Sequence, residues 1–211
     1  MERKRPTRER VIDEAMRLFG ERGYAATTIA DIESAAGLSS GSGGLYRHFA
    51  SKRAILEAGV QRQIASNAEL LKELAQQPAN NATLTVKLQA LGNAGIDRLD
   101  RERDLTRLLL HDLRNFPDLL ASAAANEIQP VHAGLAAWLT QENSGTTIDA
   151  PALAAVLAGA TAHYWLLRDI FGEHPSGVSQ QRYVSALAQM VELVLAQDDP
   201  EQTWPVPISE C

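Results

Sequence analysis

One short stretch of the chain has the residue types of a serine nucleophile. Residues 37–41, GLSSG, match the G-x-S-x-G pattern, in which a serine at a sharp strand-to-helix turn attacks a carbonyl carbon. Such a serine needs a strand before it and a histidine paired with an acid beside it. The residues before Ser39 have helical periodicity instead, and His48, the nearest histidine in sequence, would lie across a short helix. A hydrolase that uses Ser39 is therefore kept only as the alternative hypothesis.

Two other kinds of chemistry are not favoured by the residue spacing. The glycines of residues 37–44 suggest a phosphate-binding loop, but the chain has no G-x-x-x-x-G-K-[ST] sequence. The five histidines form no i, i+4 pair and have no cysteine nearby, which argues against a metal site (His48, His111, His132, His163, His174). We therefore expect no enzyme activity, no metal and no cofactor.

The composition predicts an all-α protein. Of the 211 residues, 45% are hydrophobic but only 5% are aromatic, and unbranched alanine and leucine lose little rotamer freedom in a helix. The uncharged segment 150–167 is near the lower limit for a membrane span, but it is rich in alanine and we expect a helix buried in protein, with no membrane partner. The single cysteine, Cys211, and the charged first ten residues favour a cytoplasmic location.

The N-terminal residues predict three short helices with a glycine-containing turn, which is the pattern of a helix-turn-helix. Apolar residues at helical spacing mark the first helix, at about 7–22, and Thr28 with Asp31 resembles a capping box that starts the second helix. Gly37 ends that helix, and Ser39 or Ser40 starts a reading helix that Leu45 and Phe49 fix to the core. Ser51 is the expected N-cap of a long following helix.

Charge and side-chain chemistry favour DNA as the partner of this N-terminal segment. Residues 1–53 hold ten Lys/Arg and seven Asp/Glu, whereas the rest of the chain holds ten and nineteen. Ser40 and Ser42 can hydrogen-bond bases weakly, and Gly43 allows a close backbone approach to the groove. Tyr46, His48 and Lys52 offer polar groups to phosphates, and the Arg3-Lys4-Arg5 arm is an alternative contact to the minor groove.

Residues 7–39, TRERVIDEAMRLFGERGYAATTIADIESAAGLS, followed by LYRHFASKRAILEA, resemble the DNA-binding domain of the tetracycline-repressor (TetR) family. The resemblance covers about residues 7–60. It implies a bacterial-type, dimeric transcription regulator, most often a repressor, that binds a palindromic operator and is released by a small molecule. It also implies that Thr28 seats a phosphate, that Tyr46 and His48 lie near the DNA backbone, and that Lys52 contacts phosphate. The glycine-rich gap before Leu45 is longer than the family's usual spacing by about two residues.

The rest of the chain predicts a helical body. We expect helices at about 82–99, 103–114, from Pro117 towards Leu139 with a kink or break at Pro130, 150–171 and 180–196. The expected domains are a helix-turn-helix domain at 1–55, a helical ligand-binding and dimerisation domain at 56–197, and a loose tail at 198–211.

Two sets of residues in the body are candidate sites. Polar and aromatic side chains could line a cavity for an unidentified apolar or amphipathic effector (Arg107, His111, Arg114, His163, Trp165). An apolar stripe on the last helix could form the homodimer interface with its neighbouring helix (Tyr183, Leu187, Met190, Val191, Val194).

Overall fold

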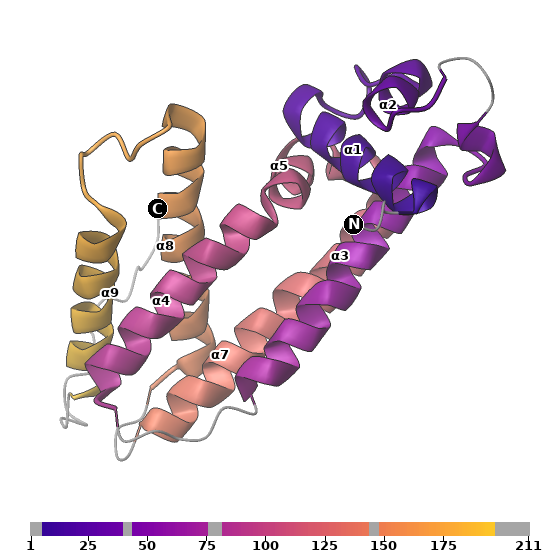
Figure 1. Ribbon diagram of the computed structural model, residues 1–211. Coiled ribbons are helices and arrows are strands. Elements are labelled where there is room, and N and C mark those ends of the chain that lie inside the picture. The colour runs from indigo at the N-terminus through magenta and orange to yellow at the C-terminus, as the bar shows by residue number, and fades with distance from the viewer. Residues whose placement is uncertain (1–5, 40–43, 76–81, 144–147, 197–211) are drawn as a thin grey trace, which may run out of the picture. The chain divides into compact units, whose positions relative to one another are not determined.

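The computed structural model describes residues 6–39, 44–75, 82–143 and 148–196, and these residues form helices and connecting turns without a strand (Figure 1). The chain divides into two compact units. The first comprises residues 1–78 and 99–131, and the second comprises residues 79–98 and 132–211. The all-α class predicted from composition is confirmed.

The first unit contains the N-terminal helices and a later part of the chain. Its elements are α1 (Thr7–Arg22), α2 (Ile29–Ala35), the 3₁₀ turn η1 (Leu45–Arg47), α3 (Lys52–Ala75), α5 (Arg103–His111), the 3₁₀ turn η2 (Leu113–Asn115), α6 (Pro117–Ala123) and the π-helical turn η3 (Ala124–Ile128). One apolar core joins Phe19 and Ile32 to Leu108 and Leu119. The expected boundary at residue 55 thus does not coincide with the division of the structure.

A close approach between α1 and α5 depends on Gly20. A methyl group added at Gly20 would lie 2.9 Å from the Cα of Asp104, which is closer than real Cβ contacts. A Gly20→Ala variant should therefore lose about 1–2 kcal/mol of unfolding free energy, because overpacking outweighs the gain in helix propensity. Gly134 has open space around it. Gly134→Ala should instead stabilise by roughly 0.5–1 kcal/mol, so urea unfolding of the two variants gives opposite signs if the packing is as described.

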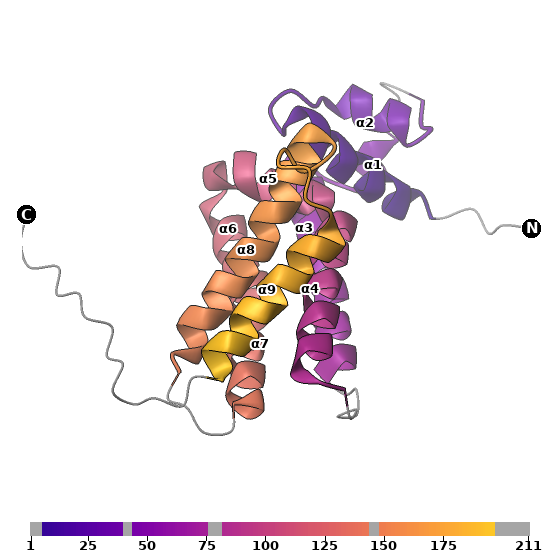
Figure 2. The same cartoon turned by 90° about the vertical axis from the view of Figure 1, so that its left-hand side faces the viewer.

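The second unit is built from α4 (Leu84–Arg101), α7 (Gln129–Glu142), α8 (Ala150–Phe171) and α9 (Gln180–Leu195) (Figure 2). The division between the units falls within α4 and α7. Buried leucine, valine and alanine side chains from these helices form its core (Leu88, Leu139, Ala154, Leu157, Ala188, Val191, Leu195).

Helices α4 and α9 meet along a line of hydrogen bonds as well as apolar contacts. Thr85 donates to Glu192 at 2.8 Å. Gln89 donates to Ser185 at 3.3 Å, and Gln180 donates to Asn93 at 3.0 Å. Residues 85, 89 and 93 recur every four positions, so these contacts lie on one face of α4.

The expected helix from Pro117 towards Leu139 is divided into α6, η3 and α7. Helix α7 begins immediately after the π-helical turn, and Pro130 is its second residue. Proline has no N–H to donate to the carbonyl four residues earlier and its ring crowds that carbonyl. The π-helical turn widens the helix just before Pro130 and relieves this crowding. It corresponds to the kink or break that the sequence predicts at Pro130.

Helix α8 is long and apolar enough to cross a membrane by length and composition alone, a test that core helices of soluble proteins also pass. Only 28% of its most apolar 18-residue window is buried within the chain. Large apolar side chains of α8 and α9 are exposed (Val156, Ile170, Phe171, Met190, Leu193, Val194). These two helices therefore present an apolar surface that their own chain does not cover.

Candidate nucleic-acid interface

Helices α1, α2 and α3 and the turn η1 surround one core in the arrangement predicted for a helix-turn-helix. Helix α2 is followed by Gly37, which has φ +68°, and Leu38 packs against the core. Leu45 and Phe49 are buried, as the sequence predicted for the residues that fix the reading segment. We use the name reading segment for residues 39–49.

The described part of the reading segment contains a single 3₁₀ turn, η1. Its exposed side chains are Tyr46, Arg47 and His48, with Tyr46 60% exposed. Ser39 is exposed after α2, whereas Ser40, Ser42 and Gly43 lie outside the described residues. The Arg3-Lys4-Arg5 arm also lies outside them.

Lys52 stabilises residues 23–28, which connect α1 to α2. Its ammonium group donates to the carbonyl oxygens of Tyr24 and Thr27, both at 2.7 Å, and lies 4.2 Å from the centre of the Tyr24 ring. Burial lowers the pKa of Lys52, and the negative charge of Asp112 opposes this shift. Two of the three ammonium donors are thus engaged within the protein.

A residue at the end of α5 also stabilises the connection between α1 and α2. Asp112, which follows α5, accepts a hydrogen bond from the backbone N–H of Tyr24 at 3.1 Å. The hydroxyl of Thr27 donates to the carbonyl oxygen of Gly23 at 2.9 Å. Residues 23–28 are therefore fixed by α3 and by the end of α5, an arrangement that no local sequence pattern indicates.

Thr28 forms the capping box predicted at the start of α2. Its hydroxyl donates to a carboxylate oxygen of Asp31 at 2.6 Å and accepts from the N–H of Asp31 at 3.1 Å. The N–H of Thr28 also donates to Asp31, at 2.8 Å. The hydroxyl group of Thr28 therefore already donates its hydrogen bond to Asp31. It can donate to a phosphate only if the hydrogen bond to Asp31 breaks.

The capping box predicts a pH-dependent effect of Thr28→Val. The Thr28 hydroxyl, and then its N–H, lower the pKa of Asp31 below 3.8. A depressed carboxyl pKa contributes stability that is present above the unfolded-state pKa and disappears as pH falls through the folded-state value. Thr28→Val should thus lower the melting temperature most above pH ~5, and the difference should narrow below pH ~3.8.

A matched control for this prediction is Thr140→Val. The Thr140 hydroxyl donates to the carbonyl oxygen of Ala136 within α7, where no carboxyl group takes part in the bond. Its effect on the melting temperature should not change with pH. Equal pH profiles for the two variants would contradict the role assigned to Asp31.

The position of Ser39 does not support the hydrolase alternative. Ser39 follows the C-terminal end of α2, and the described ranges contain no strand that could lead into a nucleophile elbow.

The candidate effector residues are divided between the two units. Arg107, His111 and Arg114 belong to the first unit, and His163 and Trp165 belong to the second. Trp165 is fully buried, whereas His111, Arg114 and His163 are exposed. The side chain of Trp165 is therefore not accessible to solvent in this conformation.

A ring stack in the second unit was not predicted from the sequence. The ring of Tyr164 stacks on those of His174 and Tyr183, with centroids 4.9 and 4.4 Å away, and the His174 and Tyr183 centroids lie 6.5 Å apart. The Tyr183 hydroxyl donates to the carbonyl oxygen of Ala160 at 2.8 Å. Since these residues lie on α8, on α9 and in the loop between them, no regular spacing along the chain indicates the stack.

The predicted dimerisation stripe of α9 has two faces in the structure. Met190 and Val194 are exposed, and Tyr183 and Leu187 are half-buried. Val191 is only 2% exposed and belongs to the core of the second unit. The structure thus assigns Val191 to the fold of its own chain, because α9 packs its 184/188/191/195 face inward.

The N-terminal region matches a known family of regulators. The model of the bacterial regulatory proteins of the tetR family matches residues 11–58. The uncharacterized HTH-type transcriptional regulator YerO of Bacillus subtilis is 31% identical over 106 residues, which are 50% of this chain and 36% of YerO. The HTH-type transcriptional repressor KstR2 of Rhodococcus jostii is 50% identical over 50 residues, 24% of each chain. The matched residues therefore span only about a third of the length of YerO and about a quarter of the length of KstR2.

A solved structure shows that the likeness in fold extends beyond the matched N-terminal region. AibR in complex with isovaleryl coenzyme A and operator DNA superposes with a TM-score of 0.66 at 18% identity, covering 88% of this chain and 97% of AibR. Residues 11–58, which match the family model, include most of α1, all of α2 and η1, and the start of α3. Residues 11–58 are thus similar to the bacterial regulatory proteins of the tetR family, and the likeness of the other helices to AibR concerns the fold alone.

Proposed function

We propose that this protein is a ligand-responsive repressor that binds a palindromic operator as a homodimer and is released by a small molecule. The observation that carries the proposal is the arrangement of α1, α2, η1 and α3 around one core, with Tyr46, Arg47 and His48 exposed on the reading segment. A cytoplasmic location follows from DNA as the partner.

Phosphate contacts supply most of the DNA affinity in this proposal. Lys52 keeps one donor for a phosphate, and the exposed Tyr46 and His48 lie on the same short segment. Thr28 contributes if its bond to Asp31 opens. The segment from Ser39 to Gly44 has no Arg, Asn or Gln, so Ser39, Ser40 and Ser42 discriminate bases weakly and DNA shape adds specificity.

Dimerisation places two reading segments on one duplex. The exposed apolar side chains of α8 and α9, with Met190 and Val194 among them, support an interface formed by these helices. A two-fold dimer matches a palindrome whose half-sites are about 34–36 Å apart.

A small molecule bound in the helical body releases the DNA in this proposal. AibR was solved with isovaleryl coenzyme A and operator DNA together, which supports effector and DNA binding by one fold of this kind. We propose an apolar or amphipathic effector near some of the candidate residues of the body (Arg107, His111, Arg114, His163, Trp165). Coupling between effector and DNA of ~1–3 kcal/mol is typical of such regulators.

Selection of duplexes from a random pool, followed by a mobility shift, tests the proposal. The protein should enrich a palindromic sequence and shift it as a single dimer complex. Recovery of no enriched sequence at physiological salt, where sequence-independent phosphate binding is weakened, would rule out an operator-binding regulator. Once a duplex has been enriched, acyl-coenzyme A compounds can be screened for their ability to release the protein from it.

A further inference from the structure

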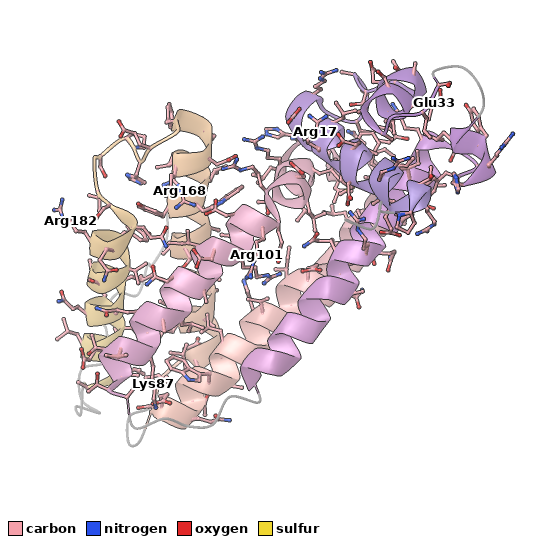
Figure 3. All side chains as sticks on the ribbon, in the orientation of Figure 1. Arg17, Glu33, Lys87, Arg101, Arg168 and Arg182 are labelled. Carbon is pink, nitrogen blue, oxygen red and sulfur yellow. The ribbon has the colours of Figure 1, made fainter. Side chains whose placement is uncertain are left out.

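The first unit contains a buried carboxyl group for which the proposed phosphate and base contacts provide no role. Glu33 lies on α2 (Figure 3). Its side chain is only 2% exposed and is among the most completely buried large side chains of the described residues. Placing a carboxyl group in an apolar core costs free energy unless polar partners compensate. A solvent-facing helix position would avoid this cost, so the placement of Glu33 calls for a specific partner.

One partner of the Glu33 carboxyl group is the backbone at the start of η1. The N–H of Leu45 donates to Oε1 of Glu33 at 3.4 Å, in a buried contact between residues twelve positions apart. The side chain of Leu45 is itself fully buried in the same core. The backbone carbonyl oxygen of Glu33 accepts from the N–H of Leu38 at 2.8 Å. Glu33 therefore contacts the chain on both sides of the glycine-rich gap.

These contacts fix the orientation of the residues that follow Leu45. Leu45 is held at two points, its side chain by the apolar core and its N–H by Glu33. Tyr46, Arg47 and His48 follow directly within or beside the same 3₁₀ turn and are exposed. A change at Glu33 would thus alter the direction of side chains that it does not touch.

We propose that Glu33 is a positioning residue for DNA recognition: its buried carboxyl group sets the backbone of Leu45 and thereby the direction of Tyr46, Arg47 and His48. The proposal rests on the proposed DNA-binding function. It assigns to Glu33 the orientation in which Tyr46, Arg47 and His48 meet the phosphates of the selected duplex and set the register on it, whereas phosphate contacts by Lys52, which form on any duplex, remain.

The test compares Glu33→Ala, Glu33→Gln and Val60→Ala. Glutamine keeps an acceptor oxygen at the same reach, whereas alanine removes it. Val60 is fully buried in the same core but lies on α3, so Val60→Ala controls for a loss of stability alone. Each variant is measured for affinity to the duplex selected by the wild-type protein and to a scrambled duplex of equal length.

Glu33→Ala should lower the ratio of the two affinities about tenfold, while binding to the scrambled duplex changes less than about twofold. Glu33→Gln should keep the ratio near that of the wild type, and Val60→Ala should keep it despite a lower melting temperature. A fall of the ratio in Val60→Ala equal to that in Glu33→Ala would overturn the proposal. So would a fall in Glu33→Gln as large as that in Glu33→Ala.

Amide hydrogen exchange gives a second measurement that does not depend on DNA binding. The Leu45 N–H should exchange about tenfold faster in Glu33→Ala than in Val60→Ala, when both are compared at equal global stability. Unchanged exchange at Leu45 would refute the positioning role whether or not the protein binds DNA. A wild-type protein that selects no duplex but shows this exchange pattern would instead refute the proposed function alone.

Discussion

Lys52→Ala should lower the melting temperature and weaken binding to every DNA duplex alike. The substitution removes two 2.7 Å hydrogen bonds to the carbonyl oxygens of Tyr24 and Thr27, which is expected to cost about 1–3 kcal/mol of stability. It also removes the remaining donor proposed for a phosphate. The slope of log K against log salt should therefore fall by about 0.9 for each phosphate that Lys52 neutralises in the wild-type complex.

The control for Lys52→Ala is Arg182→Ala. Arg182 is an exposed residue of α9 in the second unit, and its removal changes the net charge by the same amount. Thermal unfolding and mobility shifts between about 50 and 200 mM salt should show no effect of this control on the slope. If Lys52→Ala loses stability but keeps the wild-type slope, Lys52 acts only on the connection between α1 and α2 and contacts no phosphate.

Leu193→Glu should convert a dimer into monomers without unfolding the chain. Leu193 is 67% exposed on α9, so the free chain can solvate a glutamate there, whereas an apolar interface cannot. Operator affinity should fall by roughly 100-fold or more, because a monomer engages one half-site only. Sedimentation velocity at micromolar concentration measures the oligomeric state, and circular dichroism checks the fold.

Val191→Glu is the matched comparison on the same helix. Since Val191 is buried in the core of the second unit, this substitution should destabilise the fold itself, by several kcal/mol. A wild-type protein that sediments as a monomer would exclude the proposed interface. A dimer that persists in Leu193→Glu would place the interface away from this part of α9.

Local patterns in the sequence predicted most helix positions. Helix α1 was expected at residues 7–22 because its apolar residues recur with helical spacing and Gly23 follows, and its bounds agree. The Thr28–Asp31 capping box and the N-cap at Ser51, whose hydroxyl accepts from the N–H of Ala54, were predicted from residue types alone. These features depend on residues within one helical turn of each other, so the sequence contains the full signal.

Features that depend on distant residues were not predictable in the same way. The sequence predicts that Lys52 faces a phosphate. Its ammonium group donates two hydrogen bonds to the carbonyl oxygens of Thr27 and Tyr24, which lie 25 and 28 positions earlier in the chain. Val191 fitted an apolar stripe that periodicity alone could not divide into an inner and an outer face. No local pattern in the sequence distinguishes Glu33 from a solvent-exposed acidic residue, and only its packing reveals a buried carboxyl group.

The apolar core of the first unit has a consequence for synthesis of the chain in the cell. That core joins residues 11–60 to Leu105, Leu108, Leu113 and Leu119. The N-terminal helices leave the ribosome first, yet they cannot complete their core until Leu119 has followed them. At ~5–20 residues per second this delay lasts on the order of several seconds, during which α1, α2 and α3 expose apolar faces to chaperones. The part of the protein that is translated first therefore reaches its native packing only after Leu119 has been made, although the core of the second unit must wait longer, for Leu195.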